Sequence, residues 1–265
     1  MQSFSLEPEV FQQLQRLMKE ASGIFLPDHK QALVSGRLQK RLRALRLPGF
    51  SDYAAYLKTS AEERQIAIDL LTTNETRFFR EPRHFEILTD IAAQSRRPLR
   101  LWSAACSSGE EPYTMAMVMS ESAREPGWEI VASDLSRSVL DKARQGIYPV
   151  AQESQMSRDC LVRYCLRGTG SRAGYFQVNP QLARRIEFRP MNLNEPLPGD
   201  LGRFDVIFIR NVLIYFDVAA KRKILQRVLL QLVPGGYLFL GHSETVQGLG
   251  LPLSTIAPAT YRKES

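Results

Sequence analysis

Short apolar runs alternate with segments of helical pattern from about residue 99 onward, and this alternation constrains the fold more than any other feature of the sequence. The runs are LRLWSA (99–104), WEIVASD (128–134), FDVIFIRN (204–211) and GYLFLG (236–241). Strands that alternate with helices are typical of a parallel sheet joined by crossover helices. The pattern predicts an α/β fold with a doubly wound, Rossmann-like sheet.

The first 72 residues show helical patterns only. Pro8 opens an amphipathic segment that ends near Gly23, and a basic segment follows it. Ser51 or Asp52 is a candidate N-cap for a third helix. We therefore predict a small all-helical domain over residues 1–72.

Glycine-rich turns between short β-like runs interrupt the later alternation at about residues 160–190. We interpret this segment as a small antiparallel β-subdomain inserted into a sheet domain that spans residues 73–265. A chain of 265 residues is long enough to bury a substantial core in one large domain and a smaller one.

Composition restricts the location and the chemistry of the protein. No apolar run approaches the roughly 20 residues that a membrane span needs. The N-terminus lacks the basic start and apolar core of a signal peptide, so we expect a cytoplasmic protein without membrane insertion. Three cysteines without a paired zinc pattern, and three widely spaced histidines, predict no metal site. The net charge of +7 favours a partner of negative character.

The segment from Lys30 to Arg46 contains six basic residues and no acid. Apolar residues recur along it at helical spacing, and the sequence predicts that Lys30, Arg37, Lys40 and Arg41 lie on the opposite face. A solvated outer face is one interpretation, and a docking surface for an acidic partner is the other. Nucleic acid is disfavoured because the segment has no interleaved aromatic residues.

The turn CSSGEE follows the first apolar run, at the place where a nucleotide-binding unit holds its ligand. A dinucleotide site needs three glycines at close spacing, but only Gly109 is present. Glu110 and Glu111 would repel a phosphate. A cationic ligand without phosphates, such as S-adenosylmethionine, meets both conditions. The alternative is that the two glutamates only occupy the first turn of a helix, where the helix dipole favours acids.

Asp134 ends the next apolar run, where doubly wound sheets hold ribose hydroxyls. Its position favours a ligand contact. The alternative is a purely local role, in which Asp134 and Ser136 cap the following helix.

Five successive motifs resemble the signatures of the CheR-type chemoreceptor glutamate methyltransferases. They are LTTNETRFFREPRHF, LWSAACSSGEEPY, ASDLSRSVLDKARQGIY, FDVIFIRNVLIYFD and LVPGGYLFLGHSE. The resemblance extends from about residue 10 to the C-terminal end and includes the basic N-terminal segment. It implies a class I methyltransferase sheet, with S-adenosylmethionine as cofactor and S-adenosylhomocysteine as product.

The resemblance also implies which residues hold the cofactor. They come from the segment between the two domains, from the ends of the predicted strands, and from the motif MNLNEP, which flanks the adenine. The implied cofactor-binding residues are Asn74, Thr76, Arg80, Ala104, Glu111, Asp134, Leu135, Asn192, Leu193, Asn211 and Val212. Without the resemblance, Asn74 and Thr76 would be interpreted as turn and cap residues.

The implied reaction is methyl transfer to the side-chain carboxylate of a receptor glutamate. A glutamate with a pKa of about 4.3 is ionised at pH 7, so no general base is needed. By the resemblance, Arg80 clamps this carboxylate and Tyr215 donates a hydrogen bond to it. The alternatives are a surface pair between Arg80 and Glu81 and a tyrosine of the core. We expect a structural role for His242.

The implied partner is the cytoplasmic helical bundle of a chemoreceptor. Arg37, Lys40, Arg41 and Arg43 would dock on the bundle. The inserted β-subdomain, with its short turn RGTGSRAG, would bind the C-terminal pentapeptide of a receptor as an added strand. Two other functions stay open, a methyltransferase acting on RNA or another acceptor, and a non-catalytic protein that senses S-adenosylmethionine and binds a receptor. We expect a monomer.

Overall fold

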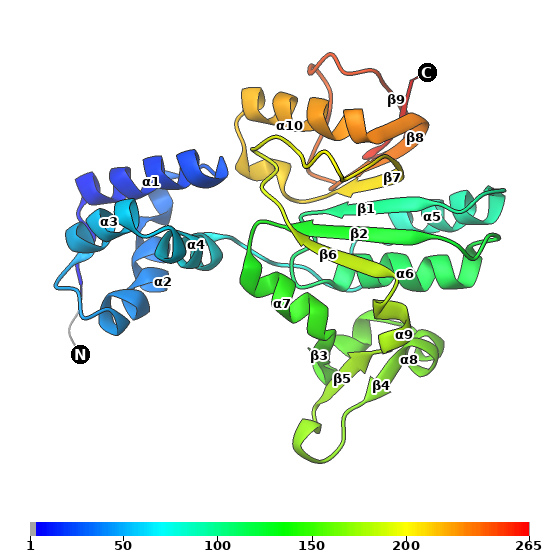
Figure 1. Ribbon diagram of the computed structural model, residues 1–265, viewed down its shortest axis with the longest axis horizontal. Coiled ribbons are helices and arrows are strands. Elements are labelled where there is room, and N and C mark those ends of the chain that lie inside the picture. The colour runs from blue at the N-terminus through cyan, green and yellow to red at the C-terminus, as the bar shows by residue number, and fades with distance from the viewer. Residues whose placement is uncertain (1–3, 265) are drawn as a thin grey trace. The chain divides into compact units, whose positions relative to one another are not determined.

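A computed structural model describes residues 4–264, so residues 1–3 and 265 of the predicted domain ranges lie outside the described residues. The chain divides into two compact units (Figure 1). The helical unit comprises residues up to 73 together with residues 215–221. The sheet unit comprises residues 74–214 and the residues from 222 onward.

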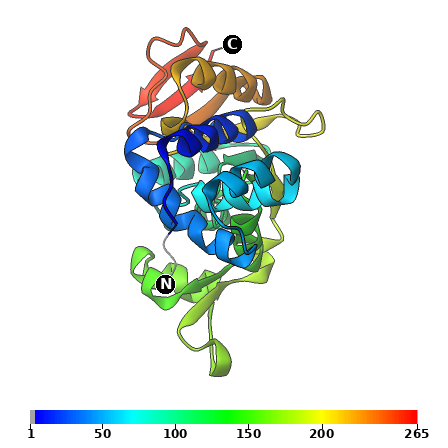
Figure 2. The ribbon, with the colours of Figure 1, turned by 90° about the vertical axis from the view of Figure 1, so that its left-hand side faces the viewer.

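Four helices, coloured blue to cyan in Figure 2, form the helical unit. They are α1 (Pro8–Ser22), α2 (Gln31–Ala44), α3 (Phe50–Thr59) and α4 (Ala61–Leu71), and the 3-10 turn η1 (Asp28–Lys30) precedes α2. Gly23 ends α1 in the left-handed conformation, as such C-caps require. The predicted cap of α3 is wrong, because Gly49 takes that position and Ser51 and Asp52 lie inside the helix.

The basic face of α2 differs from the prediction, because two of its arginines stabilise the helical unit itself. Arg37 donates to three carbonyl oxygens at the end of α4, including that of Thr72 at 2.9 Å, and so satisfies a helix C-terminus. Arg41 forms a two-point ion pair with the buried Glu63, at 2.8 and 2.6 Å. The basic residues of the segment that remain exposed are Lys40, Arg43 and Arg46.

A seven-stranded sheet with the order β6-β2-β1-β7-β8-β10-β9 forms the centre of the sheet unit. Its strands are β1 (Arg100–Ala104), β2 (Glu129–Asp134), β6 (Ile186–Pro190), β7 (Phe204–Ile209), β8 (Leu232–Leu240), β9 (Leu253–Ala257) and β10 (Thr260–Lys263). The first five run parallel to their neighbours among themselves, and β10 runs antiparallel to both β8 and β9. The doubly wound fold is therefore confirmed, and the C-terminal hairpin is an addition that the sequence analysis did not contain.

Helices cover both faces of this sheet. They are α5 (Arg83–Gln94), α6 (Glu110–Ser122), α7 (Arg137–Gln145) and α10 (Val218–Gln231). Figure 1 shows α6 and α7 on one side of the strands and α10 on the other. Because helices cover both faces, β7 is buried along its whole length and carries apolar side chains on both sides. Phe208 and Phe239 stack in the core with ring centroids 4.4 Å apart.

The winding of the chain reverses between β1 and β7. From β1 the chain proceeds through β2 to β6, and it then returns to build β7 and β8 on the other side of β1. Ligands of open α/β sheets bind at the carboxyl ends of the strands beside such a reversal. The fold therefore places a candidate site at the ends of β1, β2, β7 and β8.

The inserted subdomain is a three-stranded antiparallel sheet with the order β3-β5-β4, built from β3 (Ile147–Pro149), β4 (Cys165–Arg167) and β5 (Tyr175–Val178). The helices α8 (Arg158–Tyr164) and α9 (Pro180–Ala183) and the turns η2 (Val150–Gln155) and η3 (Gly170–Arg172) accompany it. The predicted range of 160–190 is wrong at both ends, since β3 begins earlier and β6 belongs to the large sheet, parallel to β2. As a partly exposed edge strand, β6 lacks the continuous apolar run of a central one.

Candidate active site

The turn between β1 and α6 has an unusual backbone. Ala105 and Ser107 adopt positive φ angles of 69° and 50°, and Gly109 follows with 99°. A Cβ on Gly109 would lie 2.8 Å from the Cβ of Ala143 and 2.9 Å from the hydroxyl of Tyr148. The single glycine of this turn is therefore required by close packing against α7 and β3, rather than by a pyrophosphate.

Positive φ angles recur at other parts of the same strand ends. Phe79, Glu81 and Asn211 share this conformation with the residues of that turn, and of the other described non-glycine residues only Arg46 and Ala259, which lie elsewhere, do so as well. Phe79 and Glu81 lie in the loop before α5, and Asn211 lies directly after β7. Strained backbone of this kind clusters at functional sites, where the surrounding structure holds it in place.

Asp134 connects the ends of β1 and β2. Its carboxylate accepts hydrogen bonds from the backbone N–H of Ser107 at 2.8 Å and of Ser136 at 2.9 Å. Ser136 is the N-cap of α7, so the local capping role that the sequence left open falls to Ser136. Asp134 fixes the turn at the place where a ribose would bind.

Glu110 is buried and Glu111 is mostly buried, and the two have different partners. Glu110 accepts a hydrogen bond from the hydroxyl of Ser108 at 2.8 Å. Glu111 accepts one from the hydroxyl of Ser103 at 2.7 Å and pairs with Arg210 at 3.0 Å. Burial raises the pKa of both carboxyl groups, and for Glu111 the guanidinium of Arg210 opposes this effect.

Arg210 is the centre of the site, and the sequence analysis did not identify it. Its side chain is only 2% exposed, and it pairs with Glu81 at 2.9 Å as well as with Glu111. It also donates to the backbone carbonyl of Arg80. Burial alone would raise the pKa of Glu81, but Arg210 and neighbouring N–H donors lower it below its ordinary value. Arg210 thus joins the loop before α5 to α6 at the end of β7.

Glu244 is a second residue that the sequence analysis missed. Its buried carboxylate accepts four backbone hydrogen bonds, from Asn211, Leu213, Ile214 and Gly241, at distances between 2.7 and 3.3 Å. Burial raises its pKa, and these hydrogen bonds oppose the rise. Glu244 therefore holds the loop after β7 against the loop after β8, with Asn211 between them.

The predicted residues of the linking segment lie beside the first turn. The carbonyl of Asn74 accepts a hydrogen bond from the hydroxyl of Ser107 at 2.9 Å, and Thr76 is half-buried two residues later. Arg80 is half-buried and donates to the carbonyl of Glu75 at 2.8 Å. A surface pair between Arg80 and Glu81, the alternative from the sequence, is not formed, because Glu81 pairs with Arg210.

The remaining predicted residues are more dispersed. Asn192 accepts a hydrogen bond from the N–H of Asn194 and donates one to Glu195, both at 3.0 Å, in the turn after β6. Ala104 ends β1, Leu193 is buried after β6, and Leu135 and Val212 are half-buried. Tyr215 ends the 3-10 turn η4 (Leu213–Tyr215) and belongs to the helical unit, where its carbonyl accepts a hydrogen bond from Phe25 at 3.0 Å.

The ligand that suits this site is cationic and carries no phosphate. The site presents carboxylates from the end of β2 (Asp134), from the start of α6 (Glu111) and from the loop before α5 (Glu81), and Arg210 and backbone N–H groups hold them in place. Such a set of acceptors fits the sulfonium, amino and ribose groups of S-adenosylmethionine, and its negative charge opposes a pyrophosphate. Fold and site together define a class I methyltransferase that uses S-adenosylmethionine.

Comparison with known proteins gives the family. The profile described as "CheR methyltransferase, all-alpha domain" matches residues 9–72, and "CheR methyltransferase, SAM binding domain" matches residues 74–260. The chain belongs to the CheR methyltransferase family. The resemblance, the enzyme class and the cofactor S-adenosylmethionine predicted from the sequence are thereby confirmed.

Curated relatives match over most of their length. Chemotaxis protein methyltransferase 2 of Pseudomonas aeruginosa is 44% identical over 92% of this chain and 89% of its own. The chemotaxis protein methyltransferase of Salmonella typhimurium is 42% identical over 98% of this chain and 92% of its own. That of Escherichia coli is also 42% identical, over 90% of this chain and 85% of its own.

No helix within residues 4–264 has both the length and the apolar character that a membrane span requires.

Proposed function

We propose that this enzyme methylates the side-chain carboxylate of specific glutamates on the cytoplasmic helical bundle of a chemoreceptor, and that it acts in the cytoplasm as a monomer. S-adenosylmethionine supplies the methyl group. An oxygen of the acceptor carboxylate bonds to the methyl carbon as the S–CH3 bond breaks, which gives a methyl ester and S-adenosylhomocysteine. No proton is transferred in this step.

The observation that carries the proposal is the state of the acids in the site. Glu81, Glu111, Asp134 and Glu244 each accept hydrogen bonds from guanidinium, hydroxyl or backbone donors. Each of them therefore takes part in holding the site in shape. An acceptor that is already ionised at pH 7 needs no base, and a glutamate meets this condition.

The chain's own contribution is then position and dehydration of the acceptor. Water solvates a free carboxylate and makes it a poor nucleophile, and a bound, oriented pair gains roughly 7–11 kcal/mol from proximity. We assign the carboxylate clamp to Arg80 and the orienting hydrogen bond to Tyr215. The cofactor-binding residues proposed are those from the sequence, with Asp134 at the ribose and Asn192 at the adenine edge.

Two surfaces are proposed to bind the receptor. Lys40 and Arg43 are the exposed cations of α2 and supply most of the docking charge, while Arg37 and Arg41 contribute from partly buried positions. The receptor's C-terminal pentapeptide would add as a strand to the short edge strand β4, where Leu166 is exposed. Such a tether raises the local concentration of the acceptor without taking part in the chemistry.

Incubation with methyl-labelled S-adenosylmethionine tests the proposal directly. The acceptors are receptor cytoplasmic fragments with and without the C-terminal pentapeptide, and the readout is label released as methanol by base. Carboxyl methyl esters are labile to base and N-methyl groups are not. Base-labile label in the fragment, reduced when the pentapeptide is removed, is the expected result. Binding of S-adenosylhomocysteine without any base-labile label would contradict the proposed acceptor.

A further inference from the structure

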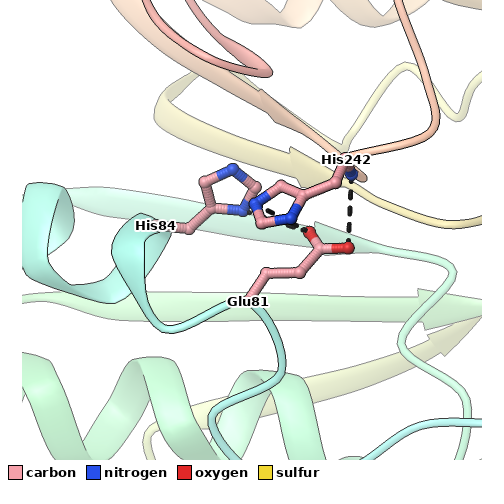
Figure 3. Close-up of side chains that lie close together, drawn as sticks. All are labelled: Glu81, His84 and His242. Carbon is pink, nitrogen blue, oxygen red and sulfur yellow. Dashed lines mark hydrogen bonds and ion pairs between the residues drawn. The ribbon is translucent and has the colours of Figure 1, made fainter.

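Two histidines and a glutamate meet beside Arg210, and one of the histidines comes from a distant part of the sequence. Glu81 lies in the loop before α5, His84 in the first turn of α5, and His242 in the turn after β8 (Figure 3). One oxygen or nitrogen atom from each lies within 4.8 Å of the other two. The prediction of no metal site rested on the wide spacing of the histidines in the sequence. The fold brings two of these histidines together, so their spacing no longer argues against a metal site.

The distances are close to those of a tetrahedral metal centre. Zinc bonds of about 2.0–2.1 Å to nitrogen and oxygen place neighbouring ligand atoms about 3.3 Å apart. Nδ1 of His84 lies 3.5 Å from Oε2 of Glu81, and Nε2 of His242 lies 4.0 Å from the same oxygen. His84 and Glu81 therefore need almost no movement. His242 is the one that must move, and its side chain is 53% exposed.

His84 is poorly explained as a simple core residue. Its side chain is fully buried, and within the described residues neither ring nitrogen makes a hydrogen bond of normal geometry, although the backbone of Pro258 interacts with the ring. A buried polar atom without a partner costs free energy, so each such atom in a native structure requires an explanation. Burial, followed by the charge of Arg210, lowers the pKa of His84 to about 4, and a neutral imidazole is the form that binds metal.

The glutamate is oriented for the same role. Its Oε1 accepts hydrogen bonds from Nδ2 of Asn211 at 3.3 Å and from the backbone N–H of His242 at 3.2 Å. These contacts turn Oε2 toward the two imidazole rings, as outer hydrogen bonds orient ligands in metal sites. Arg210 also contacts Oε2 of Glu81 and therefore competes with a metal ion for this oxygen. Its second ion pair, with Glu111, does not involve the proposed ligands and can keep Arg210 in position when a metal ion binds.

We propose that Glu81, His84 and His242 form a binding site for a divalent transition-metal ion of the zinc type. The ligands are Oε2 of Glu81, Nδ1 of His84 and Nε2 of His242, with the fourth position open to water. Two imidazoles and one carboxylate are a set that suits Zn²⁺ and Co²⁺ and does not suit Mg²⁺ or Ca²⁺.

Titration with Co²⁺ and Zn²⁺, without cofactor or acceptor, tests the site independently of methyl transfer. The full chain should bind one Co²⁺ with visible absorption bands of a tetrahedral nitrogen and oxygen centre, and Zn²⁺ should displace it. His242→Asn changes an exposed side chain and should weaken Zn²⁺ binding by roughly tenfold or more. His29→Asn, which changes the only histidine outside the site, should leave the affinity unchanged.

Two results would overturn the proposal. One is Zn²⁺ affinity that is equal in the wild-type chain and in His242→Asn. The other is a thiolate-to-cobalt charge-transfer band that disappears in the double variant Cys160→Ser, Cys165→Ser, which would assign the ion to the thiols. If His84→Asn folds, as binding of S-adenosylhomocysteine can show, it should lose the ion as well.

Discussion

Replacement of Arg210 by methionine removes the buried cation that two carboxylates share. Methionine keeps much of the apolar length of the side chain but leaves Glu81 and Glu111, whose side chains are only 12% and 11% exposed, without their ion pair. Breaking a buried pair by removal of one partner costs about 3–5 kcal/mol. We expect the free energy of unfolding of the sheet unit to fall by that amount at pH 7.5.

The loss should depend on pH in a defined direction. In the wild-type chain Arg210 lowers the pKa of Glu81. The stability that this ion pair contributes is complete above the pKa of Glu81 in the unfolded chain, about 4.3, and is lost as the pH falls through its lower pKa in the folded chain. In Arg210→Met the folded pKa of both carboxyl groups lies above the unfolded value. The destabilisation is then largest at pH 7.5 and decreases toward pH 5, as the two groups take up protons.

Urea unfolding followed by tryptophan fluorescence measures this effect. Trp102 and Trp128 are the two tryptophans of the chain and both lie in the sheet unit, so the signal reports that unit alone. Arg83→Met is the matched control, because Arg83 pairs with Glu86 at the surface and its loss should cost below about 1 kcal/mol. An unfolding free energy of Arg210→Met within 1 kcal/mol of the wild-type value at pH 7.5 would refute the assignment of Arg210 as the centre of the site.

Three other predictions concern single positions. Gly109→Ala adds a Cβ 2.8 Å from a neighbouring Cβ at a φ of 99°, so it should lower the free energy of unfolding by about 1–3 kcal/mol and weaken S-adenosylhomocysteine binding in calorimetry. Gly36→Ala, in open space on α2, should instead stabilise the helical unit by about 0.5–1 kcal/mol. Equal effects of the two substitutions would contradict the packing argument. Because the pKa of His84 is lowered to about 4, its ring signals in NMR spectra should stay at their neutral positions from pH 8 to pH 5. The free energy of unfolding should fall as the pH decreases from about 6.5 toward 4, since the unfolded chain then binds a proton that the folded one does not. Titration of the ring near pH 6.5 would show that it is solvated. Arg37→Met removes hydrogen bonds to three carbonyls and should lower the free energy of unfolding of the helical unit, measured by thermal unfolding, by about 1–3 kcal/mol. Lys40→Met should change it by less than about 0.5 kcal/mol. The reverse order would show that the capping contacts contribute little.

The central strands could be predicted from the sequence because burial on both faces gives each a continuous apolar run. LRLWSA matches β1 to within one residue at either end, and FDVIFIRN begins with β7 but extends two residues past its end. The edge strand β6 and the hairpin β9–β10 are partly exposed, and their mixed patterns resemble those of turns and small antiparallel sheets. Local pattern therefore identifies the middle of the sheet and not its edges.

The candidate site shows the same limit in a different form. The first turn and Asp134 could be located because a strand end and a helix start are visible in a short stretch of sequence. Arg210 and Glu244 could not, since a charged residue after an apolar run is equally typical of a solvated strand end. Their roles depend on partners more than 30 residues away, among them Glu81 and Asn211, which only the fold brings together.

The dependence of the loop after β7 on Glu244 has a consequence for synthesis of the protein. A growing chain emerges from the ribosome N-terminus first, and domains fold as units during this process. The backbone N–H groups of Asn211, Leu213 and Ile214 lack their carboxylate acceptor until residue 244 has emerged. The loop after β7 can therefore take its final conformation only after that point, well after the strand that precedes it has been made.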